Sequence, residues 1–504
     1  MPAQPPSFLA IDLGAESGRA ILGQLTDGRL ETRVVHRFAH GPVQLPGGLV
    51  WNTLSQHEQI LQGLRLAREM LGHDPAGVAV DTWGVDFGLI DHTGALLGLP
   101  FAYREPRFAA AMKQVIARVG AESLYQQTGI QQLAFNSIFQ LAAYREHQPR
   151  LLQQAAALLF TPDLHAWLLS GVVNCELSIA STSGLLEPRS RMWHAALLDS
   201  LQIPSSMLPA LMPAGAQVGQ LLPQVREAAG CGPVPVYACC GHDTASAVAA
   251  VPAEGVAGDW AYISSGTWSL MGVELEAPQI SPAALSSGFT NELGLGGRVR
   301  FLRNIAGLWL LQQCRAAWAR AGRTFEYDEL VGLAAQAFAE GPVAVVDPDH
   351  PVFLPLGDMP GRIAQFARAT GQNPPQSPGQ FACCCLQSLA LRYRQTLGRL
   401  ESLTGRSLAR IHIVGGGCQN ELLNQMTADC CGRSVLAGPV EATAMGNLLV
   451  QAMAAGQIGT AEELRVVVRA SSTIREFAPR VTEQARWAEL FGRFERVLQS
   501  PPEL

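Results

Sequence analysis

Hydrophobic residues follow two different spacings along the chain, and segments of the two kinds alternate. Short runs rich in Val, Ile and aromatic residues, bounded by glycine or polar clusters, are typical of β-strands. Longer segments with apolar residues three or four positions apart predict amphipathic helices. The predicted strands cover residues 8–13, 30–39, 77–83, 234–239, 260–266, 268–275, 409–417 and 434–438. The predicted helices cover residues 54–72, 107–120, 378–405, 443–456 and 483–499. This alternation predicts an α/β protein.

One short pattern occurs twice. The segment AIDLGAESGRAILGQL at residues 10–25 and the segment AYISSGTWSLMGVEL at residues 261–275 each indicate a strand, a glycine-containing turn and a strand. Each segment opens about half of the chain. We therefore predict two similar domains, 1–248 and 249–504, with a ligand cleft between them, because clefts between domains are favoured ligand sites. The alternative is a pair of ordinary hairpin turns.

Composition narrows the class of protein. The chain has 504 residues, of which 48% are hydrophobic and 15% charged, as in well-buried globular proteins. A formal net charge of −6 gives no general attraction to nucleic acid or to an anionic membrane. No apolar run reaches the roughly 18 residues of a membrane span, and the N-terminus, MPAQPPS, has no signal-peptide pattern. We expect a cytoplasmic protein that binds neither nucleic acid nor a membrane.

The single lysine excludes two kinds of ATP site. Lys113 lies in the predicted helix 107–120 and is the only lysine of the chain. A P-loop needs a lysine in its Gly-Lys-Ser/Thr sequence, and a protein kinase needs a lysine on a strand beside the phosphates. A protein with this sequence can bind ATP only by other means.

The spacing of the eleven cysteines does not indicate a metal site. They include the runs Cys239-Cys240, Cys383-Cys384-Cys385 and Cys430-Cys431, and no two have the C-x-x-C spacing that zinc sites prefer. We predict reduced, mostly buried thiols that pack as small apolar residues. A local disulfide in the region from Cys418 to Cys431 is the alternative left open.

Eight segments resemble the FGGY carbohydrate kinases, which belong to the actin-like (ribonuclease H-like) superfamily. They are DLGAESGR from Asp12, DTWGVDF from Asp81, LPFAYREPR from Leu99, CGHDTASAV from Cys240, YISSGTWSLMG from Tyr262, FTNELGLGGRVRFLRNIAGLWLLQQC from Phe289, PDHPVFLPLGDMP from Pro348 and IHIVGGGCQNELLNQMTADCCGR from Ile411. The resemblance spans almost the whole chain. It implies two actin-like domains with an ATP and sugar cleft between them. Within the family, the segments DTWGVDF and FLRNIAGLWLLQ are typical of kinases that phosphorylate L-rhamnulose at O1, using MgATP, in L-rhamnose catabolism.

The resemblance also implies where ATP and Mg²⁺ bind. The first hairpin turn is expected to hold the phosphates on its backbone amides, with Gly14 and Gly18 allowing positive φ. A carboxylate at the end of the first strand, Asp12, is expected to face Mg²⁺, through water. The implied ATP contacts are Ala15, Glu16, Ser17, Gly18, Arg19, Thr267, Gln312 and Gly416.

Glu16 does not fit a phosphate site by charge. A carboxylate beside a triphosphate is repulsive. We therefore expect the Glu16 side chain to point away from the phosphates or to reach Mg²⁺ through water, while the backbone amides of the turn face the phosphates.

Asp243 is the candidate catalytic residue. It follows a predicted buried strand and begins an Ala-rich predicted helix, a position at which an Asp is also an ordinary N-cap. The resemblance assigns it the role of general base towards the sugar hydroxyl. The implied sugar contacts are Gly84, His242, Asp243, Thr244 and Asn304.

Two further segments are candidates for sugar contacts. We interpret DTWGVDF as a hairpin in which Trp83 offers an apolar wall and Asp86 either binds hydroxyls or is a solvated turn residue. In YREPR, Glu105 stands where the family usually has Asp, which leaves its contact with the sugar open.

Two rival functions remain at this level. One is another FGGY kinase acting on L-fuculose, xylulose or a related ketose. The other is a non-catalytic actin-like protein that binds sugar or ATP, against which the intact Gly-His-Asp-Thr sequence speaks. The expected partners are the sugar and ATP, and a monomer or a weak dimer both fit the sequence.

Overall fold

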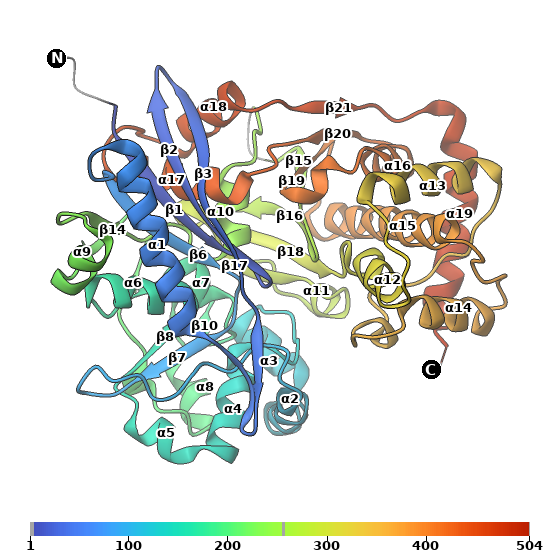
Figure 1. The fold of residues 1–504 in the computed structure, drawn as a ribbon. Helices are drawn as coiled ribbons and strands as arrows, with labels where there is room; N and C mark the ends of the chain where they lie inside the picture. The colour runs from blue at the N-terminus through green and yellow to red at the C-terminus, as the bar shows by residue number, and fades with distance from the viewer. Residues whose placement is uncertain (1–4, 255–257, 503–504) are drawn as a thin grey trace. The chain divides into compact units, whose positions relative to one another are not determined.

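Two β-sheets with helices packed on them form the framework of the chain (Figure 1). The computed structural model describes residues 5–254 and 258–502. The first sheet has the strand order β13-β14-β6-β1-β2-β3 and the second has the order β17-β18-β16-β15-β19-β20-β21. Strands alternate with helices along the chain, so the predicted α/β class is confirmed.

The strands of the first sheet are β1 (Ser7–Leu13), β2 (Ser17–Thr26), β3 (Arg29–Ala39), β6 (Gly77–Thr82), β13 (Gln217–Gln220) and β14 (Pro235–Tyr237). Those of the second are β15 (Trp260–Ser265), β16 (Ser269–Leu275), β17 (Thr290–Leu293), β18 (Val299–Ile305), β19 (Arg410–Val414), β20 (Ser434–Ala437) and β21 (Arg475–Phe477). Four strand pairs lie outside these sheets: β4 (Pro42–Leu45) with β5 (Gly48–Trp51), β7 (Phe87–Ile90) with β8 (Ala157–Phe160), β9 (Cys175–Glu176) with β12 (Leu211–Met212), and β10 (Leu186–Glu187) with β11 (Met192–Trp193).

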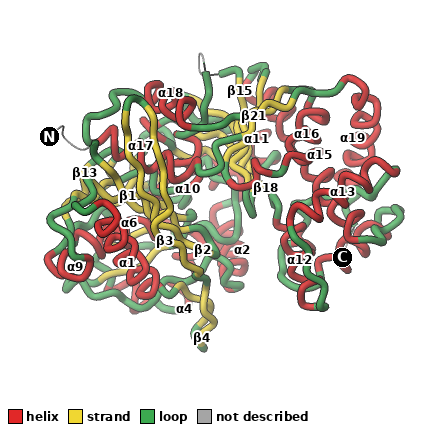
Figure 2. Tube along the Cα trace, turned by 45° about the horizontal axis from the view of Figure 1, so that its top comes forward, coloured by secondary structure: helices red, strands yellow, loops and turns green. Residues whose placement is uncertain are grey.

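Both predicted strand–turn–strand units are antiparallel hairpins. In the first, β1 pairs with β2 and Leu13 lies opposite Gly18. In the second, β15 pairs with β16 and Ser265 lies opposite Ser269. Strands β1, β2 and β3 run side by side in Figure 2.

The predicted hairpin in DTWGVDF is wrong. Strand β6 ends at Thr82 and pairs in parallel with β1, whereas β7 begins at Phe87 and pairs with β8. The segment between them turns the chain away from the first sheet into a separate two-stranded sheet.

The chain folds into two compact units that are not consecutive in sequence. The first contains residues 1–252, 274–301 and 441–472, and the second contains residues 253–273, 302–440 and 473–504. The division of the chain at residue 248 stays a prediction about its domains.

The helices of the first unit lie on both sides of its sheet strands in sequence. They are α1 (Thr53–Leu71), α2 (Arg107–Val119), α3 (Ala121–Thr128), α4 (Ser137–His147), α5 (Pro149–Gln154), α6 (Thr161–Ser170), α7 (Leu177–Ser181), α8 (Ala195–Ser200), α9 (Pro223–Ala229), α10 (Asp243–Ala249), α11 (Pro282–Ser286), α17 (Ala442–Ala454) and α18 (Ala461–Ser471). The α1 prediction differs from the structure by one residue at each end, as helix ends commonly do.

Strand β1 divides the core of the first unit between its two faces. Leu9, Ile11 and Leu13 pack in one hydrophobic cluster with Ile60 and Leu64 of α1. Because side chains alternate along a strand, Asp12 points to the opposite face. Helix α17 packs against β1 and β6 on that face. A second cluster joins α2, α4 and the β7–β8 pair.

The second unit is built around one long helix. Its helices are α12 (Trp309–Arg320), α13 (Tyr327–Glu340), α14 (Met359–Ala369), α15 (Pro378–Thr404), α16 (Glu421–Cys431) and α19 (Gln484–Gln499). Helices α12, α13, α16 and α19 all pack against α15, which explains why apolar residues occur on every side of it.

The cysteines form no disulfides. All eleven are thiols, and only Cys431 is more than slightly exposed. The prediction of reduced, buried thiols is confirmed, and burial raises the pKa of the Cys384 thiol well above its ordinary value. Within the described residues, no helix combines the length and the apolar character needed to cross a membrane.

Helices α10 and α17 approach each other closely at Gly446. A Cβ atom built on Gly446 would lie 1.9 Å from the backbone oxygen of Ser246, so glycine alone fits this crossing. By contrast, a Cβ atom on Gly398 of α15 would meet no atom within 4 Å.

We predict that Gly446→Ala lowers the free energy of unfolding by about 1–3 kcal/mol, because the contact is with rigid backbone. Gly398→Ala is the matched control and should raise it by about 0.5–1 kcal/mol through helix propensity. Denaturant titration of both variants measures the two changes. An unaltered midpoint for Gly446→Ala would show that α10 and α17 do not cross as closely as described.

Candidate functional site

The turn after β1 is a tight hairpin whose backbone is partly open to solvent. The Gly14 N–H donates to the backbone oxygen of Ser17 at 2.9 Å, and the side chains of Glu16 and Ser17 are exposed. Gly14 and Gly18 would allow positive φ, but neither adopts it. Glycine is needed at 18 for another reason, because a Cβ atom there would lie 2.2 Å from the Phe38 ring.

Arg19 joins two carboxylates in the first unit. Its Nη2 lies 2.5 Å from Asp12 Oδ2, and its Nη1 pairs with Glu441 at the start of α17. Burial alone would lower the pKa of Arg19, but the charges of Asp12 and Glu441 outweigh it and raise the pKa. Arg19, which the family resemblance implies as an ATP contact, therefore also pairs with Asp12, the carboxylate that is expected to face Mg²⁺.

Asp81 is a second carboxyl beside Asp12. The two residues lie opposite each other in the parallel β1–β6 register, and the Asp81 side chain is fully buried. Asn447 of α17 donates to Asp81 Oδ2 at 2.6 Å, while Oδ1 has no hydrogen-bond partner among the described residues. Burial first, and then the charge of Asp12, raise the pKa of Asp81 well above its ordinary value.

A buried glutamate holds the Gly-His-Asp segment in place. Glu176 accepts hydrogen bonds from the backbone N–H groups of Ser178 and Ile179, so it caps α7. The same carboxylate accepts from the Gly241 N–H at 2.9 Å and from the Ser178 hydroxyl at 2.5 Å. The His242 N–H donates in turn to that hydroxyl at 3.4 Å. Four donors therefore compensate the burial of Glu176 and position the backbone on which Asp243 stands.

Asp243 is the first residue of α10, and His242 occupies the N-cap position. One carboxylate oxygen, Oδ1, accepts from the Thr244 N–H at 2.5 Å and from the Thr244 hydroxyl at 3.1 Å. His242 Nε2 lies 3.3 Å from the same oxygen. No hydrogen bond from the described residues reaches Oδ2, and the side chain is 31% exposed. The pKa of Asp243 is raised by burial, which His242 opposes and Asp12 reinforces.

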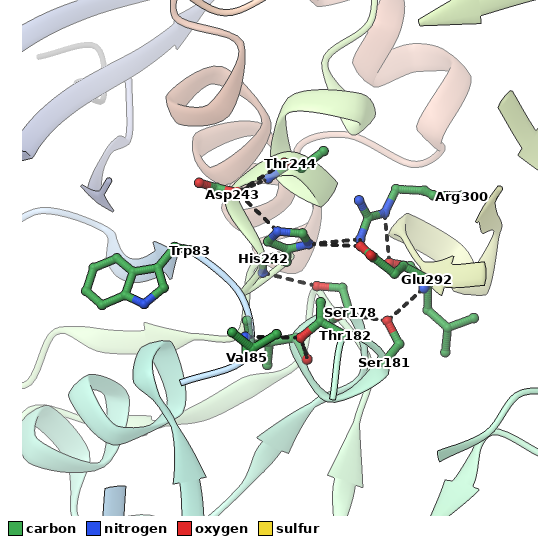
Figure 3. A network of polar contacts seen from close by, with 12 residues as sticks. Trp83, Val85, Ser178, Ser181, Thr182, His242, Asp243, Thr244, Glu292 and Arg300 are labelled. Carbon is green, nitrogen blue, oxygen red and sulfur yellow. Dashed lines mark hydrogen bonds and ion pairs between the residues drawn. The ribbon is translucent and has the colours of Figure 1, made fainter. Parts of the chain in front are cut away.

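The other ring nitrogen of His242, Nδ1, also has protein contacts (Figure 3). Its Nδ1 lies 3.3 Å from Glu292 Oε2 on β17 and 3.1 Å from Arg300 Nη2 on β18. Arg300 and Glu292 form an ion pair at 3.0 Å, and both are buried. Burial would raise the pKa of Glu292, but the hydrogen bond from His242 and the charge of Arg300 hold it below its ordinary value.

Gly84 lies beside His242, as expected if both contact the sugar. A Cβ atom on Gly84 would meet the Thr182 hydroxyl at 3.3 Å and His242 Nε2 at 3.5 Å. The next residue, Val85, has a φ of 72°, which is costly for a β-branched side chain. Its N–H donates to the Thr182 hydroxyl at 3.2 Å, so α7 and its following turn hold this strained backbone next to His242.

Asp86 is not available to a sugar. Its Oδ2 accepts from the indole N–H groups of Trp51 and Trp83, at 2.6 and 2.9 Å, and from the Tyr103 N–H at 3.0 Å. Its Oδ1 accepts from the Gln140 amide at 2.8 Å, and burial raises its pKa to about 6 against these donors.

The two other first-unit candidates are also engaged by protein. Trp83 is 7% exposed, with its ring centroid 4.2 Å from that of Trp51, so its ring mostly contacts protein. Both oxygens of Glu105 are engaged as well, by the Leu49 N–H and by Arg107.

In the second unit, the predicted ATP residues gather at one end of β15 and β19. Thr267 lies in the turn between β15 and β16, and its backbone oxygen accepts from the Trp309 N–H at the start of α12, the helix that carries Gln312. A Cβ atom on Gly417 would lie 2.1 Å from the Ser265 hydroxyl, so the glycine run after β19 packs on the end of β15. Gly416 is exposed, with no atom within 4 Å of such a Cβ.

The other predicted residues have simpler positions. Ala15 is half-buried in the first turn, and Thr244 is buried. The Thr244 hydroxyl is bonded to Asp243, so any contact it makes with a sugar would add to that bond. Asn304 lies on β18 in the second unit and is half-buried.

Sequence reasoning missed the residues that support the predicted ones. Glu176, Glu292, Arg300, Glu441 and Asn447 were not singled out, because each lies far along the chain from the residue it contacts. Asp81 had a visible signal, a carboxyl inside the otherwise apolar run GVAV-D-TW, and Glu292 and Arg300 lie within a segment that carries the family resemblance.

Comparison with protein families matches both parts of the chain. The family model described as the N-terminal domain of the FGGY family of carbohydrate kinases matches residues 7–250, and that of the C-terminal domain matches residues 261–455. A rhamnulokinase of Bacteroides thetaiotaomicron is 38% identical over 98% of this chain and 99% of its own length. A rhamnulokinase of Bacillus subtilis is 36% identical over 96% of this chain and 98% of its own length.

Solved structures share the fold at lower identity. A ligand-bound xylulose kinase from Lactobacillus acidophilus has a TM-score of 0.79 at 13% identity, covering 98% of each chain. Plasmodium falciparum glycerol kinase with ADP also has a TM-score of 0.79 at 13% identity, covering 99% of each chain. The two-domain sugar-kinase fold is thereby confirmed. Together with the family matches over nearly all of its length, this shows that the chain belongs to the FGGY family of carbohydrate kinases.

Proposed function

We propose that this kinase transfers the γ-phosphoryl group of ATP to the 1-hydroxyl of L-rhamnulose, giving L-rhamnulose 1-phosphate and ADP. The observation that carries the proposal is the asymmetric carboxylate of Asp243, fixed through Oδ1 and open at Oδ2. Relatives named rhamnulokinase, at 36–39% identity over more than nine-tenths of the chain, support the choice of sugar.

Asp243 suits the role of general base. Phosphoryl transfer needs the attacking hydroxyl to be oriented and its proton to be accepted. The Thr244 N–H and hydroxyl, with His242, hold Oδ1, so Oδ2 is the oxygen that would accept the proton of the sugar hydroxyl. A raised pKa makes Asp243 a stronger base than a solvated carboxylate. Gly84 and His242 lie close to each other and would bind the rest of the sugar.

The residues present fit a hydrated Mg²⁺ that arrives with ATP. Asp12 and Asp81 are neighbouring carboxyls, and the buried Oδ1 of Asp81 lacks the donor that a metal-bound water would provide. Among the described residues, no group of three or more His, Cys, Asp or Glu could hold a metal by itself. This suits Mg²⁺, which keeps several waters and takes phosphate oxygens with one or two carboxylates. When bound, Mg²⁺ would neutralise phosphate charge.

The ATP contacts belong to the same proposal. Ala15 and Glu16 lie in the first hairpin turn, Ser17, Gly18 and Arg19 begin β2, and Thr267 lies in the second turn. Gln312 lies on α12, whose first residue bonds to the Thr267 backbone, and Gly416 lies in the glycine run that packs on the end of β15. Their contact with ATP, that of Asn304 with the sugar, a cytoplasmic location and the oligomeric state stay predictions.

The sugar is tested directly by a coupled ADP-release assay over a ketose panel. We predict the highest kcat/KM for L-rhamnulose, compared with L-fuculose, xylulose and related ketoses, and NMR of the product should show phosphate on O1. A clear preference for another ketose would assign a different sugar substrate and leave the sugar-kinase activity in place. Tight ATP binding without turnover on any sugar would favour a non-catalytic actin-like protein.

Asp243→Asn removes the base while keeping the size of the side chain. We predict that kcat falls by about 10²–10⁴-fold, with circular dichroism and thermal unfolding close to those of the unmodified chain. Asp199→Asn, at an exposed acid of α8, is the control and should leave kcat unchanged. Near-normal turnover by Asp243→Asn would remove Asp243 from the mechanism.

Glu16→Ser tests the role of the acid in the first turn. The exposed side chain places its charge beside the predicted phosphate site, so its removal should tighten ATP binding without changing the Mg²⁺ dependence of turnover. Isothermal titration with ATP and activity over a range of Mg²⁺ concentrations measure both quantities. A shift of the Mg²⁺ dependence to higher concentration would instead assign Glu16 to the metal.

A further inference from the structure

A buried ion pair stands behind the candidate base. Arg300 is fully buried, donates from Nε to the backbone oxygen of Leu293 at 3.0 Å, and pairs through Nη2 with Glu292. Buried ion pairs are weak sources of stability, because removing two charges from water costs about as much as their attraction returns. The location of this pair therefore calls for another explanation, and its remaining contact is with the ring of His242.

The contacts of His242 determine which ring nitrogen carries a proton. If the ring is neutral and accepts from Arg300 at Nδ1, 3.1 Å away, the proton is on Nε2. If the ring is charged, Nδ1–H donates to Glu292 at 3.3 Å and Nε2 is again protonated. The third arrangement, with Nε2 unprotonated, would put a lone pair against the Asp243 carboxylate. Both favoured arrangements make Nε2–H a donor to Asp243 Oδ1, at 3.3 Å.

We propose that Glu292 and Arg300 are positioning residues for the kinase reaction, which act through the His242 imidazole to fix the Asp243 carboxylate with Oδ2 towards the sugar hydroxyl. The strands β17 and β18 hold the pair, the pair orients the ring, and the ring holds Oδ1 (Figure 3). Neither Glu292 nor Arg300 needs to touch the sugar. The inference rests on the proposed role of Asp243 and adds the residues that orient it.

Charge placement supports this chain of contacts. Glu292 and Arg300 neutralise each other, so the pair presents hydrogen-bonding groups to Nδ1 without adding net charge near Asp243. The Thr244 N–H and hydroxyl hold Oδ1 from the first turn of α10, and His242 at the N-cap holds it through a ring that Glu292 of β17 and Arg300 of β18 contact. Two independent sources of donors restrict rotation of the carboxylate more than Thr244 could alone, and small losses of alignment at a reacting group lower rates strongly.

The test removes both charges together. Replacing one member would leave an unpaired buried charge and confound folding with catalysis, whereas neutral replacement of both often preserves stability. We predict that Glu292→Gln with Arg300→Met lowers kcat by about 10- to 100-fold, with KM for ATP and the thermal midpoint nearly unchanged. The matched control is Glu274→Gln with Arg465→Met, at a second ion pair of the first unit with a 2.5 Å contact. That control should keep its kcat.

A second measurement asks whether the pair acts through His242. In a His242→Gln background, adding Glu292→Gln and Arg300→Met should lower kcat by less than a further factor of two. The effects of substitutions at residues that act through one another are not additive. A full additional loss, or an unchanged kcat in the native background, would overturn the proposal. If the double variant does not fold, ¹⁵N NMR of labelled histidine in the unmodified chain decides, with His242→Gln identifying the signal. A protonated Nε2 supports the proposal and an unprotonated Nε2 contradicts it.

The outcomes separate this inference from the proposed function. If Asp243→Asn keeps turnover, the role of the base fails. If that variant is inactive while the Glu292 and Arg300 double variant is fully active, only the positioning role fails.

Discussion

The carboxylate of Glu176 is the interaction on which the candidate site depends. It is buried, accepts four hydrogen bonds, and joins the N-terminus of α7 to the backbone of Gly241. Without an acceptor there, the Gly241 N–H and the first turn of α7 would be buried donors without partners, which costs free energy. The position of His242 and Asp243 follows from this bond, because they are the next two residues.

Three neighbouring acids of the first unit have different environments and are therefore suited to different tasks. Asp12 is paired with Arg19, Asp81 is buried against Asn447, and Asp243 faces His242 with one oxygen open. Burial raises the pKa of both Asp81 and Asp243, and the charge of Asp12 adds to both shifts. An enzyme that brings a triphosphate and a sugar hydroxyl together needs one carboxylate for the metal and another for the proton.

Local sequence patterns predicted the parts of this structure that depend on neighbouring residues. The two hairpins, the long helix α15 and the strand before Gly-His-Asp were found because each has a periodicity or a glycine turn in one continuous segment. Asp86 shows what local sequence patterns cannot predict. From the sequence it could bind sugar or face solvent, and its actual partners, Trp51, Trp83 and Gln140, are spread over some ninety residues of chain.

The roles of glycines were predicted only in part. Gly18 is required by the ring of Phe38, which no turn rule reveals, and Gly446 is required by the backbone of α10. The Glu292–Arg300 pair lies in a segment that carries the family resemblance, but its contact with His242 joins residues more than forty positions apart. The sequence could therefore single out Asp243 as the proposed base, whereas its link through His242 to Glu292 and Arg300 is visible only in the fold.

A crystal structure with L-rhamnulose and a non-hydrolysable ATP analogue tests the central claim, that Asp243 is the base, most directly. The account predicts the sugar O1 at hydrogen-bond distance, about 2.6–3.2 Å, from Asp243 Oδ2, with Oδ1 still bonded to His242 and Thr244. A sugar whose O1 is bonded to another carboxylate, with Asp243 beyond the reach of a hydrogen bond or of one bridging water, would contradict it.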